Sequence, residues 1–205
     1  MFLLITLLPL LGPALPGGEG TSARAADLQK LEEWVDLERS FTDARREEAR
    51  KAVAGHLEKA TEFTDAEFYM EVRRIVGLAD NGHSNVSDAP IHERFGLLPL
   101  RTYWFSEGLY VVRAREVQRA LLGARIVAVE GRPIDELETR LLAYFGGTVE
   151  YFRHRTAALL LLSPALMHVA GLAERPDRLS LKLMSREGKV VEGGRRGRSR
   201  LQRLP

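Results

Sequence analysis

The residues with the clearest chemical potential form the short turn Asp80-Asn81-Gly82-His83-Ser84. Its histidine, His83, carries an imidazole that titrates near neutral pH, which suits general acid–base chemistry. A turn that contains glycine lets such a side chain project into a cleft. His83 is therefore a candidate general base, and the alternative is a turn histidine with a structural hydrogen bond. Asp80 either orients this imidazole or caps the end of the preceding helix.

Metal and thiol chemistry have little support in the sequence. There is no cysteine, so disulfides and thiolate ligands are excluded. The other histidines lack the spacing of a metal pair with acidic support, and we expect them on the surface or in packing: His56, His92, His154 and His168. We therefore predict that the protein has no metal site and no cofactor.

Three helices are predicted before the turn. Apolar residues recur at helical spacing within residues 26–59, and Thr42-Asp43 marks a new N-cap that divides this stretch. A capping box at Thr64 and Glu67 begins a third helix, which runs to about Ala79. Residues 26–79 are therefore expected to form a small helical domain.

The pattern changes at residue 80. Glycine and proline punctuate residues 80–100, which we interpret as a linking turn and loop. Strands and helices then alternate, with strands predicted at 101–105, 109–113, 125–129, 179–184 and 189–191 and helices at 134–144, 151–162 and 165–170. The expected fold class is α+β, with a small mixed sheet over residues 101–192 that contains a helical insertion.

The N-terminus has the features of a secretory signal peptide. Residues 2–11 are mostly apolar but too short to span a bilayer comfortably, and Ala23-Arg24-Ala25 is a small-x-small cleavage signature. We predict a signal peptide over residues 1–25, cleavage before Ala26, and a secreted or periplasmic protein. No basic residue precedes the apolar run, and the alternative is a membrane anchor that stays attached.

The basic character of the chain comes from its C-terminal tail. The formal net charge is +2 and the pI about 9.0, but residues 193–205 hold five arginines and no acidic residue. Without them, 25 basic residues stand against 28 acidic ones, so the body gives no support for nucleic-acid binding. We predict that the tail is disordered. One alternative is that the tail binds anionic lipid or nucleic acid. Another is that a frameshift near codon 192 produced the tail, since GC-rich coding sequence translated in a shifted frame tends toward arginine and glycine.

Three segments together point to a family. Leu78–Ser84 is similar to an Asp-Gly-His-Thr turn, Leu98-Pro99-Leu100 leads into the strands around Gly108–Val111, and Leu122–Pro133 is similar to a Gly-Ala-x-Ile/Val-x-x-Ile-Asn/Asp-Gly-x-Pro signature. In this order they resemble the carboxy-terminal-processing (tail-specific) serine peptidases, most closely the tricorn-core branch, whose PDZ-like domain carries the last signature. The resemblance covers roughly residues 27–192.

The resemblance implies roles for particular residues. His83 would be the general base. In PDZ-like domains a Gly-Leu turn presents backbone N–H groups to a peptide carboxylate and the next strand pairs with the peptide. This assigns peptide binding to Gly108, Leu109, Tyr110 and Val111, and the alternative is an ordinary hairpin. The implied partners are peptides or the C-termini of unfolded proteins.

The sequence departs from the family in its nucleophile. The family's catalytic serine lies in a later α/β core, whereas here no Gly-x-Ser-Ala turn is visible and no lysine or glutamate partner has a counterpart. Ser163, Ser180 and Ser199 lack the adjacent base and oxyanion hole that a nucleophile needs. We therefore expect a truncated N-terminal portion of an extracytoplasmic serine peptidase, without the catalytic core and inactive alone. The alternative is a non-enzymatic PDZ-like peptide-binding module.

Overall fold

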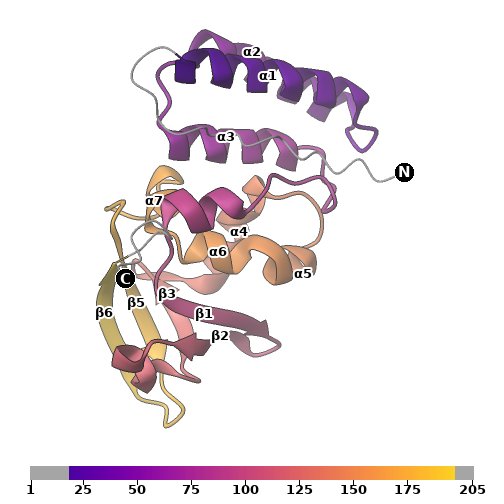
Figure 1. Cartoon of the computed structure of the whole chain (residues 1–205). Helices are drawn as coiled ribbons and strands as arrows, with labels where there is room; N and C mark the ends of the chain where they lie inside the picture. Colours follow the sequence, from indigo (N-terminus) through magenta and orange to yellow (C-terminus); the bar gives the residue numbers. More distant parts are fainter. Residues whose placement is uncertain (1–18, 197–205) are drawn as a thin grey trace. The chain divides into compact units, whose positions relative to one another are not determined.

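A computed structural model describes residues 19–196 of the 205-residue chain (Figure 1). The chain divides into two compact units. Unit 1 comprises the residues up to Ser87 together with Ala143–Thr148, and unit 2 comprises Asp88–Leu142 together with the residues from Val149 onward. Unit 1 is helical and unit 2 combines helices with an antiparallel sheet, which confirms the predicted α+β class.

Unit 1 is built on three helices that run side by side in Figure 1: α1 (Glu19–Leu37), α2 (Asp43–Glu58) and α3 (Asp65–Gly77). The predicted caps are present. The Thr42 hydroxyl accepts the backbone N–H of Arg45 at 3.3 Å. Thr64 and Glu67 form a reciprocal capping box, with the Thr64 N–H donating to the Glu67 carboxylate at 2.7 Å. These bonds satisfy backbone donors that the first turn of a helix leaves without partners.

The core of unit 1 is formed by apolar side chains that recur at helical spacing on each helix. Each large apolar side chain that is fully buried contributes roughly 1.5–3 kcal/mol through removal of its surface from water. The buried residues include Leu28, Leu31, Trp34, Val35, Ala49, Val53, Phe68, Met70, Val72 and Ile75.

Helix α1 begins earlier than the sequence predicts. Residues 1–18 of the predicted signal peptide lie outside the described residues, but residues 19–25 form the first part of α1. Arg24 donates to the Asp65 carboxylate and to the backbone oxygen of Phe63, both at 2.6 Å. Cleavage before Ala26 stays a prediction.

Helices α2 and α3 are joined by a charged cluster around Glu71. Its carboxylate lies 2.9 Å from the imidazole of His56 and accepts two hydrogen bonds from Arg74, at 2.9 and 2.8 Å. The bond to His56 is the largest influence; together with Arg74 it outweighs burial and lowers the pKa of Glu71 to about 2.

Replacing Glu71 with glutamine is therefore expected to cost stability in a pH-dependent way. The folded pKa lies below the unfolded value of about 4.3, so the carboxylate stabilises the fold above that pH and loses this effect as the pH falls toward 2. We expect a loss of about 1–3 kcal/mol at pH 7 that disappears near pH 2. Urea unfolding across this range measures it. Glu32→Gln, at an exposed site on α1, is the control, and an equal loss at pH 7 and pH 2 would contradict the prediction.

Unit 2 contains a six-stranded antiparallel sheet. The strands are β1 (Leu100–Phe105), β2 (Gly108–Ala114), β3 (Arg125–Val129), β4 (Arg132–Pro133), β5 (Arg178–Met184) and β6 (Val190–Arg196). Their order is β1-β2-β3-β5-β6, with the short β4 paired to β3. The predicted hairpin between β1 and β2 is present, and β6 extends beyond the predicted strand. Residues 193–196 therefore pair with β5, while residues 197–205 of the predicted tail lie outside the described residues.

Short helices gather on one side of this sheet in Figure 1. They are η1 (Ile91–Phe95), α4 (Ile134–Leu141), α5 (Val149–Phe152), η4 (Arg153–Ala157), α6 (Ala158–Leu161) and α7 (Pro164–Val169). A further short helix, η2 (Glu116–Leu121), follows β2 and lies apart from this group at the other end of the sheet. The turn η3 (Leu142–Tyr144) connects α4 to the segment of unit 1 that interrupts unit 2. Alternate residues of the strands face these helices and are buried, among them Trp104, Leu109, Val111, Ile126, Leu181 and Leu183.

Candidate functional site

The turn that carries His83 follows helix α3. Asp80 adopts a left-handed backbone conformation with φ of 49°, which reverses the chain after the helix. The side-chain oxygen of Asn81 accepts the backbone N–H of His83 at 3.1 Å, and the backbone oxygen of Asn81 accepts the N–H of Ser84 at 2.9 Å. These bonds form an Asx turn. The His83 side chain is exposed on it.

Two consecutive glycines, Gly146-Gly147, support the turn from within unit 1. A β-carbon on Gly146 would lie 2.6 Å from the nitrogen of Asn81, and one on Gly147 would lie 2.7 Å from the nitrogen of Gly82. Gly147 has a φ of +95°, and its N–H donates to the Asp80 carboxylate at 3.0 Å. The carboxylate of Asp80 thus fixes the turn against this diglycine segment. Only glycine permits so close an approach between two backbones.

A second support comes from the loop between α1 and α2. The Glu38 carboxylate accepts hydrogen bonds from the backbone N–H of Ser40 and the hydroxyl of Ser84, both at 2.9 Å. The Asn81 amide donates to the hydroxyls of Ser40 at 2.9 Å and Ser84 at 3.3 Å. Burial disfavours the charged form of Glu38, but the hydrogen bonds from Ser40 and Ser84 outweigh it and lower the pKa of Glu38.

The arrangement gives an exposed imidazole on a turn that is held from two sides, which is what a general base requires of its position. The serines that the sequence singled out do not supply a nucleophile beside it. Ser163 is completely buried in unit 2, Ser180 lies exposed on β5, and Ser199 lies outside the described residues. The hydroxyl of Ser84, next to His83, donates to the carboxylate of Glu38.

The predicted peptide-binding residues, Gly108–Val111, lie on β2, which is an inner strand. The backbone of Tyr110, for example, faces Tyr103 on β1 and Arg125 on β3. Both edges of this stretch are therefore occupied by the protein's own strands. An incoming peptide strand needs a free edge, so the predicted pairing of a peptide with these residues finds none. Binding through their side chains stays a prediction.

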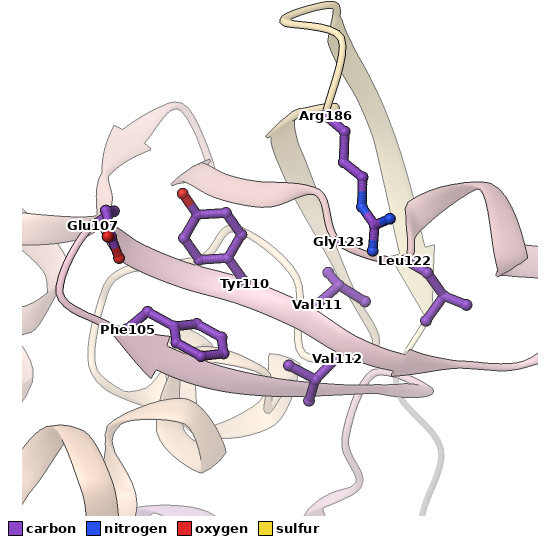
Figure 2. Close-up of a pocket in the computed structure, with 8 residues that line it drawn as sticks. All are labelled: Phe105, Glu107, Tyr110, Val111, Val112, Leu122, Gly123 and Arg186. Carbon is purple, nitrogen blue, oxygen red and sulfur yellow. The ribbon is translucent and has the colours of Figure 1, made fainter.

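A groove with a volume of about 510 Å³ lies beside β2 on unit 2 (Figure 2). Phe105, Tyr110, Val112 and Leu122 supply apolar walls, and Glu107 and Arg186 supply charged groups. Apolar walls with a few polar groups are typical of ligand-binding grooves.

Two of the four residues predicted to bind peptide line the groove. Tyr110 and Val111 line it, whereas Gly108 and Leu109 line a second depression of about 400 Å³. A partly buried ion pair lines that second depression: the Glu138 carboxylate accepts two hydrogen bonds from Arg153, at 2.5 and 2.9 Å. The structure therefore does not bring the four predicted residues together in one site.

The sequence analysis did not identify Arg186 as part of a site. Arg186 lies in the turn between β5 and β6, and its guanidinium covers Gly123, where a β-carbon would lie 2.1 Å from the arginine Nε (Figure 2). Gly123 has a φ of +77°, a conformation that favours glycine. No local signal links two residues so far apart in the chain. Tyr103 and Phe105 are expected from their size to pack in the core or between domains, but both are exposed. Their alternation with the buried Trp104 along a predicted strand is the local signal that could have shown this.

The remaining histidines are dispersed. His56 pairs with Glu71, His154 lies 5.9 Å from the ring of Tyr103, and the Nδ1 atom of His168 lies 3.0 Å from the backbone oxygen of Ala173. Within residues 19–196, no group of three or more histidine and acidic side chains is arranged to hold a metal ion. None of the helices in that range is long and apolar enough to cross a membrane.

No protein-family model matches the chain, and no match was found among curated proteins. Two solved structures of CPAF, a serine protease, share its fold. One is a serine-to-alanine mutant, with 15% identity and a TM-score of 0.50, and the other is the mature protein complexed with lactacystin, with 17% identity and a TM-score of 0.52.

Each alignment covers 87% of this chain but only 34 or 35% of the CPAF chain, so the chain spans about a third of the length of these structures. The chain therefore shares the fold of about a third of CPAF. At this level of identity the likeness concerns the fold alone.

Proposed function

We propose that this chain provides the N-terminal, substrate-handling part of an extracytoplasmic serine peptidase of the tail-specific type. The observation that carries the proposal is the likeness in fold to CPAF over 87% of the chain, together with an exposed histidine on a supported turn. Unit 1 would hold the base, and unit 2 would bind the peptide. The predicted signal peptide favours a secreted or periplasmic location, with membrane attachment only through an uncleaved signal.

In this proposal His83 acts as the general base. An imidazole accepts a proton from a nucleophile most effectively when its position is fixed in advance. The diglycine segment and the carboxylate of Glu38 fix the turn that carries this imidazole. The nucleophile is not among Ser163 and Ser180, because the first is buried and the second lies within a strand.

A second candidate function is peptide binding without catalysis. The groove beside β2 supports it, because its apolar walls and charged ends suit a peptide. The proposed partners are peptides or the C-termini of unfolded proteins, without nucleic acid, metal or cofactor.

The purified chain is expected not to cleave casein or tail peptides, since its sequence offers no activated serine. Hydrolysis that is abolished by His83→Ala would contradict this expectation.

Translation of the coding DNA past codon 192 in all three frames tests the peptidase assignment directly. A Gly-x-Ser-Ala turn with a lysine or glutamate partner in any frame supports it, and none in any frame would leave peptide binding as the function. Titration with peptides bearing free or amidated C-termini then tests binding, and a lack of any binding removes that function.

A further inference from the structure

Three aromatic side chains lie on one face of the β1–β2 hairpin, and two of them are exposed while the third, Tyr110, is half-buried. Tyr103 is 50% exposed and Phe105 is 46% exposed, although rings of this size are usually largely buried. Their ring centroids lie 4.8 Å apart, and the ring of Phe105 lies 5.7 Å from that of Tyr110. Both contacts are edge-to-face, so the three rings form one connected cluster that is ordered before any partner arrives.

The alternation of side chains along the strands explains why these rings face outward. On β1, Leu100 and Trp104 are buried beneath the helices, so Tyr103 and Phe105 must point to the opposite face. Tyr110 is the cross-strand partner of Tyr103 and shares its face. Helices α4 to α7 cover the other side of the sheet. His154 of η4 reaches the margin of the aromatic cluster, with its ring centroid 5.9 Å from that of Tyr103, and the unit's own core leaves the rest of this face uncovered.

Arginines border the aromatic cluster. Arg101 and Arg113 are direct cross-strand partners, and neither forms an ion pair with any residue in the described part of the chain. Like charges placed directly opposite each other are destabilising. Arg186, which covers Gly123 in the adjoining groove, forms no ion pair within residues 19–196, although its charge interacts electrostatically with the neighbouring Glu187. The single acidic residue of the groove is Glu107.

These features favour a polypeptide over a nucleic acid as the occupant. Single-stranded nucleic acid stacks its bases on open aromatic faces, but here the edge-to-face contacts place ring edges against ring faces. Tyrosine, phenylalanine and arginine are the residues enriched at protein interfaces and among their hot spots. Arg101 and Arg113, which face each other without an ion-pair partner in the described part of the chain, call for acidic groups on the partner.

We propose that the aromatic–arginine face, formed by Tyr103, Phe105, Tyr110, Arg101, Arg113 and Arg186, docks an acidic polypeptide segment. An apolar side chain of that segment lies on the aromatic cluster, and its glutamates or aspartates pair with the arginines. The inference rests on the proposed binding of peptides by unit 2 and specifies their chemistry, namely acidic side chains around an apolar anchor.

The test uses the full chain and three fluorescein-labelled probes measured by anisotropy. The first is a peptide with one phenylalanine flanked by glutamates, made with free and with amidated C-termini. The second has glutamines in place of the glutamates, and the third is an oligothymidine. We expect the acidic peptide to bind at least tenfold more tightly than the glutamine peptide, whatever its C-terminus, and its affinity to fall as salt is added.

Variants locate the binding. Arg101→Gln combined with Arg113→Gln, and separately Phe105→Ser, are expected to weaken binding of the acidic peptide about tenfold or more. Arg140→Gln on helix α4 is the matched control and should leave it unchanged. The arginine variant should also keep or raise the urea midpoint, because it relieves a like-charge pair, so weakened binding cannot be attributed to unfolding.

The outcomes separate this inference from the proposed function. Equal binding of the acidic and glutamine peptides, or binding that the variants do not change, overturns the acidic docking face and leaves peptide binding standing. Binding of neither peptide overturns both. Tighter binding of oligothymidine than of the acidic peptide overturns the choice of a polypeptide as the occupant.

Discussion

Replacing Gly147 with alanine is expected to lower the free energy of unfolding of unit 1 by about 3 kcal/mol. The residue has a φ of +95°, which strains any residue with a β-carbon, and that carbon would lie 2.7 Å from the nitrogen of Gly82. Relief of this clash requires the turn of His83 to move away from the diglycine segment, with loss of the bond from Gly147 to Asp80.

Tryptophan fluorescence during urea unfolding measures this loss. Trp34 lies buried in unit 1 and Trp104 in unit 2, so a Trp104→Phe background makes Trp34 the reporter of unit 1. Hydrogen exchange at the N–H of Ser84 then shows whether the turn itself has loosened, since that N–H donates to Asn81 within the turn.

Alanine substitutions at two other glycines separate the steric clash from the backbone strain. Gly146→Ala introduces a carbon 2.6 Å from the nitrogen of Asn81 at a position where φ is not positive, and thus measures the clash alone. Gly171→Ala, with a φ of +69° and open space around it, measures the backbone strain alone and should cost about 1–2 kcal/mol. Because Gly171 lies in unit 2, its loss is measured in a Trp34→Phe background, in which Trp104 is the reporter. A loss in Gly147→Ala no greater than in Gly171→Ala would mean that the close approach to the turn does not constrain it.

The second large effect is expected at Arg73, whose side chain is only 1% exposed in unit 1. Its guanidinium donates to the hydroxyl of Tyr69 at 2.6 Å and to the backbone oxygens of Tyr144 at 3.4 Å and Val86 at 3.5 Å. It therefore joins helix α3 to Val86, which follows the His83 turn in the chain, and to Tyr144, which lies just before the diglycine segment. Arg73→Leu keeps the apolar volume but leaves these buried acceptors without a donor, and we expect a loss of about 3 kcal/mol or more.

The same fluorescence assay checks this prediction, with two comparisons. Arg73→Lys keeps the charge but cannot donate in the planar fork that serves three acceptors, so it should lie between wild type and Arg73→Leu. Arg45→Leu removes an exposed arginine paired with Glu48, and such surface pairs contribute at most about 1 kcal/mol. Equal losses in Arg45→Leu and Arg73→Leu would show that water replaces the buried donors.

Features set by neighbours in sequence were predictable. The caps at Thr42 and Thr64, the hairpin between β1 and β2, and the buried strand at residues 125–129 all depend on residues within a few positions of one another. Capping bonds, turn residues and the apolar periodicities of helices and strands all involve residues within that range, so they can be recognised directly in the sequence. His83 on its turn belongs to the same group, since the bond that shapes the turn runs from its own N–H to Asn81.

Features set by distant contacts were not predictable. Local sequence patterns predict the turn that presents His83 and the strand β2, whereas the residues that surround them follow from the packing of distant elements. Gly147 reaches the turn from 67 residues beyond Asp80, β3 closes the second edge of β2, and Arg186 is brought over Gly123 by the pairing of β5 with β3. The reason is physical: periodicity and capping record local geometry, whereas the choice of which surfaces meet depends on how whole elements pack, and no short stretch of residues encodes it.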